Sequence, residues 1–254
     1  MKLNDVIAAL GLPDSAMVNQ RIPKKLLAEN GAPTFADKRG ILEDIEELQW
    51  VAALKPVNIA VPAYLENTRI YEEIAVLSLE LRPAARPARL AELVHRAIPY
   101  PVLLFVSSGH SISVSLAHIR QAQNEADKTV LDGDATLANV PDDETGQRFL
   151  QALALAKQPR TDLFALYQGW IDTVTALEAA ALTGHFSASV KREQAEVRHK
   201  ALQQCREIQT RIDTLRTATK KERQLARQVA TNNEIKSLTV ELSAAKAILN
   251  QGTP

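Results

Sequence analysis

The sequence predicts an α+β protein with a mixed β-sheet body and flanking helices, then a helical region, then a C-terminal coiled-coil-like helical tail. Two observations favour this fold class. Between residues 48 and 140, apolar residues alternate with others or form short runs bounded by turn residues, which is typical of strands. From residue 141 onward they recur at helical spacing, and residues 187–250 contain neither Gly nor Pro. Strands followed by helices form an α+β pattern.

We therefore expect three parts: an α+β body over 1–140, a helical region over 141–186 packed on the body, and a basic coiled-coil-like tail over 187–254. The formal net charge of zero hides an asymmetry between these parts. From residue 187 onward there are 13 Lys and Arg against 7 Asp and Glu, so the tail carries about +6 and the remainder about −6. Such a split predicts docking within the molecule or an anionic partner.

Composition predicts a cytoplasmic protein. The 46% of hydrophobic residues can form a core, but with only 4% aromatic residues Ala and Leu must fill much of it. The single cysteine, Cys205, excludes an internal disulfide and a cysteine-rich metal site, which fits a reducing compartment. No apolar run approaches the roughly 20 residues that a membrane span needs, and Met1–Asp5 does not resemble the start of a signal peptide.

In the body, period-2 alternation and apolar runs mark the strands, and turn residues separate them. The first element is different: it is a short amphipathic helix that ends at Gly11 and Pro13. A second short helix is expected between the strands, with Leu90, Leu93, Val94 and Ala97 on one face. The expected strands cover 48–54, 57–61, 70–82, 102–106 and the residues from 111, with short edge strands at 129–131 and 135–140.

The expected helices of the C-terminal half run over 145–157, 161–182 and then through the tail. Gly184 is a plausible C-terminal cap of the second. In the tail, Thr231-Asn232-Asn233-Glu234 has the spacing of a capping box, in which Thr and Glu bind the free amides at a helix start. The prediction is a long helix, a break near Thr231 and a shorter second helix.

The second tail helix carries a candidate interaction seam. Ile235, Leu238, Leu242 and Leu249 recur with alternating steps of three and four, as at the a and d positions of a coiled coil. Such a stripe must be buried against a partner, either in the chain's own globular part or in another chain.

The first part of the tail is a candidate nucleic-acid interface. Residues 198–227 contain nine Lys and Arg against three acidic residues. Lys220, Lys221, Arg223 and Arg227 are the cations that we expect to contact phosphates. The alternative is a solvated helix face, because no aromatic residues are interleaved with these charges.

Motifs for catalysis are scarce. No glycine-rich phosphate loop and no metal-ligand spacing occur, so we expect no metal and no cofactor. The lone His118 is expected to be a hydrogen-bonded structural residue, and Asp132-Gly133-Asp134 to be a turn.

One constellation points to a divergent metal-dependent nuclease. The order helix, three strands, helix, strand resembles restriction-endonuclease-like nucleases, which need carboxylates for Mg²⁺ and a Lys beside them. Here Glu73 and Glu80 would be the metal ligands and Arg82 would stand where a Lys is wanted. Arg82 cannot do the work of a Lys that loses its proton, because a guanidinium stays charged in proteins. Asn58 stands where the motif would need an Asp. The alternative is that these carboxylates are structural.

A succession of short motifs runs through nearly the whole chain. The motifs are Ile22-Pro23-Lys24-Lys25-Leu26, Asp37-Lys38, Ile45 to Trp50, Leu54-Lys55-Pro56, Asn58-Ile59, Glu73-Ile74, Glu80-Leu81-Arg82, Ile98-Pro99-Tyr100-Pro101, Lys221-Glu222-Arg223-Gln224 and Asn233-Glu234-Ile235-Lys236. This succession resembles the bacterial domain-of-unknown-function family 4391. The resemblance implies a genetic context: such proteins tend to be encoded beside helicases and DNA methyltransferases of restriction-like, phage-defence operons. It implies no catalytic residues.

The expected function is an accessory, non-enzymatic subunit of a DNA-directed bacterial defence or restriction-like system. It would work with a helicase or a DNA methyltransferase through its helical tail. Two alternatives stay open at this point. One is the divergent nuclease, and the other is a coiled-coil homodimer with a purely structural role.

Overall fold

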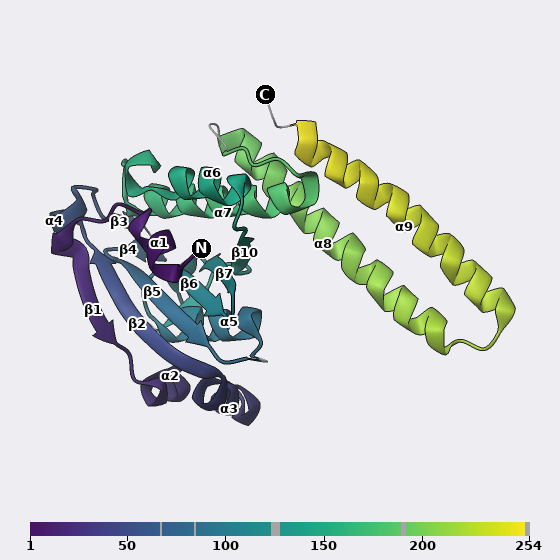
Figure 1. Ribbon diagram of the computed structural model, residues 1–254, viewed down its shortest axis with the longest axis horizontal. Helices are drawn as coiled ribbons and strands as arrows, with labels where there is room; N and C mark the ends of the chain where they lie inside the picture. Colours follow the sequence, from purple (N-terminus) through teal and green to yellow (C-terminus); the bar gives the residue numbers. More distant parts are fainter. Residues whose placement is uncertain (67, 84, 123–127, 189–191, 252–254) are drawn as a thin grey trace. The chain divides into compact units, whose positions relative to one another are not determined.

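The computed structural model describes residues 1–66, 68–83, 85–122, 128–188 and 192–251 (Figure 1). The chain divides into two compact units, Met1–Leu177 and Glu178–Pro254, and each is described by itself. The division falls inside helix α7 (Leu163–Thr183), between the two boundaries expected at residues 140 and 186. The predicted α+β class is confirmed by a mixed sheet and a helical C-terminal region. Among the described helices, none has the length and apolar character needed to cross a bilayer.

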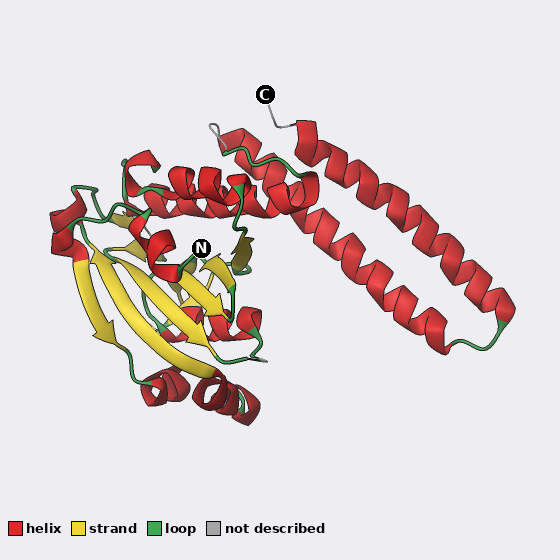
Figure 2. Ribbon diagram, in the orientation of Figure 1, coloured by secondary structure: helices red, strands yellow, loops and turns green. Residues whose placement is uncertain are grey.

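Within the described residues, the first unit is built around a six-stranded sheet whose spatial order follows the order of the chain (Figure 2). Neighbouring strands are antiparallel except β5 and β6, which are parallel. A parallel pair needs a crossover, and helix α5 (Pro87–Ala97) supplies it. In spatial order the strands are β1 (Met17–Arg21), β2 (Ile45–Leu54), β5 (Ile74–Leu81), β6 (Val102–Ser108), β7 (Ser111–Leu116) and β10 (Thr136–Val140).

Helices α2 (Lys24–Gly31), α3 (Phe35–Asp44) and α5 cover one face of this sheet (Figure 1). Alternate residues of the central strands, such as Leu77 and Leu79 of β5, pack with the apolar stripe of α5 in one buried cluster. The approach of α2 to α5 is close, because a Cβ on Gly31 would lie 2.6 Å from the Cβ of Ala97. Continuous apolar runs in β5 and β6 follow from burial on both faces.

The opposite face is covered by α1 (Leu3–Ala8), α6 (Glu144–Leu153) and the first part of α7. Their large side chains, Phe149, Tyr167 and Trp170, are fully buried. The hydroxyl of Tyr167 donates to the carbonyl of Val102 at 2.7 Å, so the first part of α7 is attached to the first residue of β6. Two short 3₁₀ helices, η1 (Asp14–Ala16) and η2 (Leu155–Lys157), lie in the segments that follow α1 and α6.

Four short strands form two further sheets beside the main one. Strand β3 (Tyr64–Glu66) pairs with β4 (Arg69–Tyr71), and β8 (Ile119–Gln121) pairs with β9 (Thr129–Leu131). The two pairs are joined because the backbone N–H of Gln121 donates to the carbonyl of Thr68 at 2.7 Å. These small sheets carry most of the polar network described in the next subsection.

Two strand predictions are wrong in detail. The strand expected over 57–61 is the short helix α4 (Pro56–Ile59), because Pro56 is preset for a first helical position and the Asn58 side chain accepts from the Lys55 N–H at 2.8 Å. Ala60 then adopts the left-handed region, with φ of 52°. The strand expected over 70–82 is divided, and β4 and β5 belong to different sheets. Strand β1 was not predicted.

The second unit contains a helical hairpin, formed by α8 (Arg192–Lys221) and α9 (Leu225–Gln251). Apolar residues of the two helices face each other in one buried cluster, which also includes the free thiol of Cys205. The buried members on α8 are Ala201, Leu202, Cys205, Ile208 and Ile212, and those on α9 are Leu238, Leu242, Ala245 and Leu249.

The predicted break near Thr231 is wrong, because the chain reverses at residues 222–224. There the Glu222 side chain accepts from the backbone N–H groups of Arg223, at 2.8 Å, and Gln224, at 2.9 Å. Thr231 lies inside α9, and its hydroxyl donates to the carbonyl of Arg227 at 2.9 Å. Glu234 does not complete a capping box but pairs with Arg211 of α8 at 2.5 Å.

Candidate functional site

The four predicted phosphate-binding cations lie together at the turn of the hairpin, which we call the basic tip: Lys220, Lys221, Arg223 and Arg227. Two end α8, one is in the turn and one is in the first turn of α9. All four are exposed. In the part of the chain that the structure describes, their one ion pair joins Arg227 to Glu222 at 3.7 Å. The tip therefore presents uncompensated positive charge.

Glu222 is the acidic residue of this turn, and its role is structural. Hydrogen bonds from the backbone N–H of Gln224, and then of Arg223, lower the pKa of its carboxyl group. The ionised carboxylate therefore accepts these two hydrogen bonds and stabilises the turn that reverses the chain. Its single negative charge offsets one of the four cations, so the basic tip keeps a net positive charge.

The predicted interaction seam lies on the face of α9 that packs against α8. Leu238, Leu242 and Leu249 are buried there, and the half-buried Ile235 packs against the same cluster. The apolar stripe is therefore covered within the chain itself. A partner that used the seam would have to displace α8.

The residues of the alternative nuclease site are not brought together. Glu73 precedes β5 and pairs with the Lys55 ammonium group at 3.0 Å. Glu80 is exposed near the other end of β5, about 23 Å away at roughly 3.3 Å per strand residue. Arg82 donates to Glu46 at 2.5 Å. Ligand bonds to Mg²⁺ are about 2.1 Å long, so Glu73 and Glu80 cannot hold one ion.

The acidic neighbour of Glu80 across the sheet is itself paired with Arg21 of β1, at 3.6 Å. In the register of the sheet, Glu80 stands opposite Glu47 of β2 and Ser107 of β6. Asn58, which stands where the nuclease motif would need an Asp, lies in α4 rather than on a strand. Among the described residues, no group of three or more His, Cys, Asp and Glu side chains has a metal-binding arrangement.

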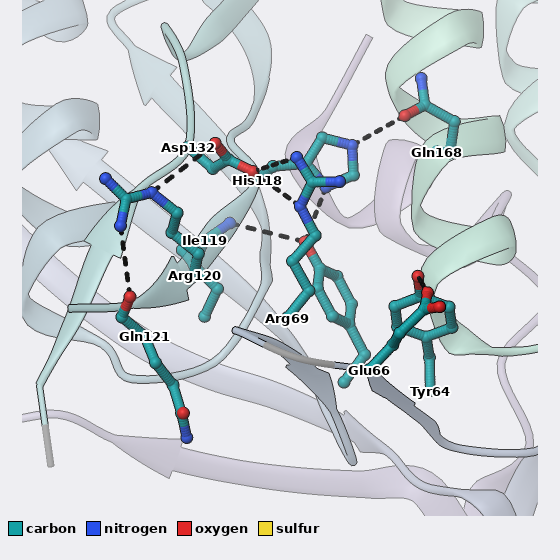
Figure 3. A network of polar contacts seen from close by, with 10 residues as sticks. Tyr64, Glu66, Arg69, His118, Ile119, Arg120, Gln121, Asp132 and Gln168 are labelled. Carbon is teal, nitrogen blue, oxygen red and sulfur yellow. Dashed lines mark hydrogen bonds and ion pairs between the residues drawn. The ribbon is translucent and has the colours of Figure 1, made fainter. Parts of the chain in front are cut away.

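A polar network that the sequence did not predict surrounds Asp132 (Figure 3). Arg69 of β4 donates to one carboxylate oxygen, Oδ2, through Nε at 2.8 Å and Nη2 at 2.5 Å. Arg120 of β8 approaches the other oxygen, Oδ1, through Nε at 3.8 Å. The hydrogen bonds to Asp132 raise the pKa of the Arg69 guanidinium. Gly133, with φ of 98°, permits the turn that places this carboxylate between the two strands.

His118 forms the inner layer of the same region. Its Nε2 lies 2.8 Å from the side-chain oxygen of Gln168, and its Nδ1 lies 2.6 Å from the Tyr71 hydroxyl. Gln168 donates through its amide nitrogen to Asp172 at 2.8 Å, so its oxygen must accept from His118. His118 is therefore protonated on Nε2, and Tyr71 donates to Nδ1. Burial lowers the pKa of His118, which favours this neutral form.

Aromatic rings connect the inner and outer layers. The Phe164 ring of α7 stacks on His118 and on Tyr64, with centroids 4.9 Å apart in both pairs. The Arg69 guanidinium lies over the same Phe164 ring, 5.6 Å from its centroid. Tyr64 in turn donates its hydroxyl to Glu66. The result is a fixed wall of rings and charged groups facing a small surface cavity.

Sequence reasoning could have found little of this cluster. His118 is hydrogen-bonded, as the sequence predicted, and Asp132-Gly133-Asp134 is a turn. The sequence gave no signal for the cluster, because Tyr64, Arg69 and Tyr71 are about 50 residues or more from Arg120 and Asp132. Those segments come together where β4 packs beside β8 and the backbone N–H of Gln121 donates to the carbonyl of Thr68.

Comparison with known protein families gives one result that covers most of the chain. Residues 10–242 match the family described as domain of unknown function (DUF4391). No curated protein and no solved structure matches the chain. The match includes the six-stranded sheet, the small sheets and most of the hairpin. The chain therefore belongs to the DUF4391 family.

Proposed function

We propose that this protein is an accessory, non-enzymatic subunit of a DNA-directed bacterial defence or restriction-like system. In this proposal the hairpin of α8 and α9 contacts nucleic acid through the basic tip. A helicase or a DNA methyltransferase would supply the chemistry, as the family resemblance implies.

The observation that supports the proposal is the exposure of Lys220, Lys221, Arg223 and Arg227 at one end of the hairpin. Cations that lack acidic partners gain from phosphates because binding releases condensed counterions. In the described chain only Arg227 of these four has an ion pair, and its distance of 3.7 Å is long. Contacts of this kind read no base sequence, so the tip would position the complex rather than select a site.

The experiment measures the affinity of the full chain for a labelled DNA duplex at several salt concentrations. Replacing Lys220, Lys221 and Arg223 with Glu should reduce the affinity. It should also reduce the slope of log affinity against log salt by about 3, at roughly 0.9 per lost phosphate contact.

A matched control is the charge reversal of Lys236, which is exposed on α9 outside the basic tip. This variant should bind DNA almost as tightly as the original protein, because a single distant cation contributes little. Equal binding by the control and the triple variant, with unchanged salt slopes, would contradict a DNA contact at the tip. Helical content measured by circular dichroism must be the same in all three proteins.

A further inference from the structure

A small cavity opens between the two short sheets of the first unit. Strands β3 and β4 form one side, and β8 with the turn after β9 forms the other. Its volume is about 160 Å³. The residues that line it are Tyr64, Glu66, Thr68, Arg69, Arg120 and Asp132.

The size of the cavity limits its ligand to a small group. At about 30 Å³ for each water, it holds roughly five water molecules. Sites for larger metabolites usually measure about 300–1,000 Å³. The cavity is therefore suited to one ring or one phosphate group, and not to a complete cofactor.

Charge distinguishes these two kinds of ligand. The lining contains two guanidinium groups and two carboxylates, so its formal charge is zero. Arg69 is already committed to Asp132 by two hydrogen bonds. A phosphate would meet the negative charge of Asp132 and Glu66 as well as the arginines. An uncharged ring that carries both donors and acceptors meets no such repulsion.

The donors and acceptors of the cavity that have no partner in the described part of the chain indicate which kind of ring would fit. Among the described residues, Nη1 of Arg69 and Nη2 of Arg120 donate to no protein acceptor, and Oδ1 of Asp132 has only the 3.8 Å contact with Arg120. Free donors therefore lie beside a free acceptor. Guanine presents the complementary set: O6 and N7 accept from a guanidinium, and the N1 and N2 hydrogens donate to a carboxylate.

Tyr64 supplies a flat surface for such a ring. It is half-buried on the cavity wall and is supported by the stacked Phe164 ring, with an interplanar angle of 25°. Stacking of a base on an aromatic side chain contributes about 1–3 kcal/mol by alanine substitution. We propose that this cavity binds a single unstacked nucleobase, and that guanine is the base it fits best. This inference is independent of the basic tip.

The test measures binding of nucleoside monophosphates to the full-length protein by isothermal titration calorimetry. Guanosine monophosphate should bind. Inosine monophosphate lacks only the 2-amino group and should bind at least about fivefold more weakly, since one base contact is worth about 1–3 kcal/mol. Adenosine and cytidine monophosphates should bind more weakly still. Inorganic phosphate in excess should not displace the guanosine nucleotide.

Three results would overturn the proposal. Phosphate that competes as well as the nucleotide would make the cavity an anion site. Equal affinity for all four nucleotides would mean that no base edge is read. Absence of measurable binding would mean that the cavity holds only water.

Substitutions in the cavity test whether the nucleotide binds there. Arg120→Gln replaces the guanidinium by a shorter, uncharged amide and leaves the pair between Arg69 and Asp132 intact, so it should weaken guanosine monophosphate binding at least about fivefold. Tyr64→Leu removes the ring and provides a second variant if the first does not fold. Arg148→Gln changes an exposed arginine of α6 that pairs with Glu144, and it should bind normally. Binding that survives both Arg120→Gln and Tyr64→Leu in folded protein would place the nucleotide elsewhere and overturn the proposal.

Discussion

Arg89 of α5 holds the carboxylate of Asp37 at the start of α3 through two parallel hydrogen bonds, from Nε and Nη2, each 2.8 Å long. The two residues are 52 positions apart in the sequence. The pair therefore ties together two of the helices that cover one face of the sheet. Arg89 also donates to Glu92 at 2.8 Å, so the guanidinium is fixed on two sides.

This pair predicts an acid-dependent loss of stability. The hydrogen bonds from Arg89, with a further one from Thr34, lower the pKa of Asp37 from 3.8 to about 2. A carboxyl group with a lowered folded-state pKa stabilises the protein above its unfolded pKa, and this contribution disappears as pH falls from about 4 to about 2. Asp37→Asn should therefore lower the urea midpoint at about pH 6, and the difference from the original protein should shrink toward about pH 2.

The control for this experiment is Glu43→Gln. Glu43 pairs with Arg39 on the same helix, but both side chains are largely exposed. Exposed pairs of this kind contribute little. A difference between Asp37→Asn and the original protein that stays constant with pH would show that the loss has a cause other than this ion pair.

The second prediction concerns the core of the hairpin. Leu238 has 6% of its surface exposed and packs against α8, whereas Val240, two residues later on α9, is 71% exposed. Leu238→Ala should reduce the free energy of unfolding by about 2–5 kcal/mol, because it leaves a cavity. Val240→Ala should change it by at most about 0.5 kcal/mol. Thermal unfolding followed by circular dichroism at 222 nm, the usual helix wavelength, measures both.

Leu238 also provides a test of assembly. If the seam serves only the hairpin, Leu238→Asp should unfold the hairpin without changing the molecular mass measured by light scattering. A mass that falls by half on this substitution, with helical content retained, would instead support the coiled-coil homodimer.

The third prediction is that the first unit folds without the hairpin. Helix α7 ends at Thr183, and Gly184, with φ of 80°, donates its backbone N–H to the carbonyl of Ala180 at 2.7 Å. The central sheet and the buried Tyr167 and Trp170 all precede this point. A chain truncated after Gly184 should therefore keep a cooperative thermal transition. Gradual melting would mean that the core of the first unit requires the hairpin.

Elements with a strong local signal could be predicted from the sequence. The run from Val102 to Val106 is apolar without interruption, and β6 is a central strand buried on both faces. The cations of the basic tip are close in sequence, so their proximity in space follows. Pro56 shows the limit: the alternating residues after it suggested a strand, but its preset backbone and the Asn58 hydrogen bond favoured a turn of helix.

The cluster around Asp132 could not be predicted for a different reason. Arg69 and Asp132 are 63 residues apart, and nothing near either residue indicates a partner. Their contact depends on the packing of β4 beside β8, two strands that belong to different short sheets. Thr231 was misleading in another way. A capping-box pattern predicts a helix start only where the backbone before it is not helical. Here the backbone leaves the helix at Glu222, whose side chain stabilises the turn, and Thr231 lies inside the next helix.

The last prediction is that the purified protein does not cleave DNA or RNA with Mg²⁺ or Mn²⁺. Glu73 and Glu80 are separated by the length of β5, about 23 Å, so they cannot share an ion. Glu73 is also paired with Lys55, and Arg82 with Glu46. Glu80→Gln should therefore behave like the original protein in every cleavage assay. Metal-dependent cleavage that Glu80→Gln abolishes, and that Glu73→Gln retains, would restore the nuclease alternative. It would also assign the metal to Glu80 and its neighbour across the sheet, Glu47, rather than to Glu73.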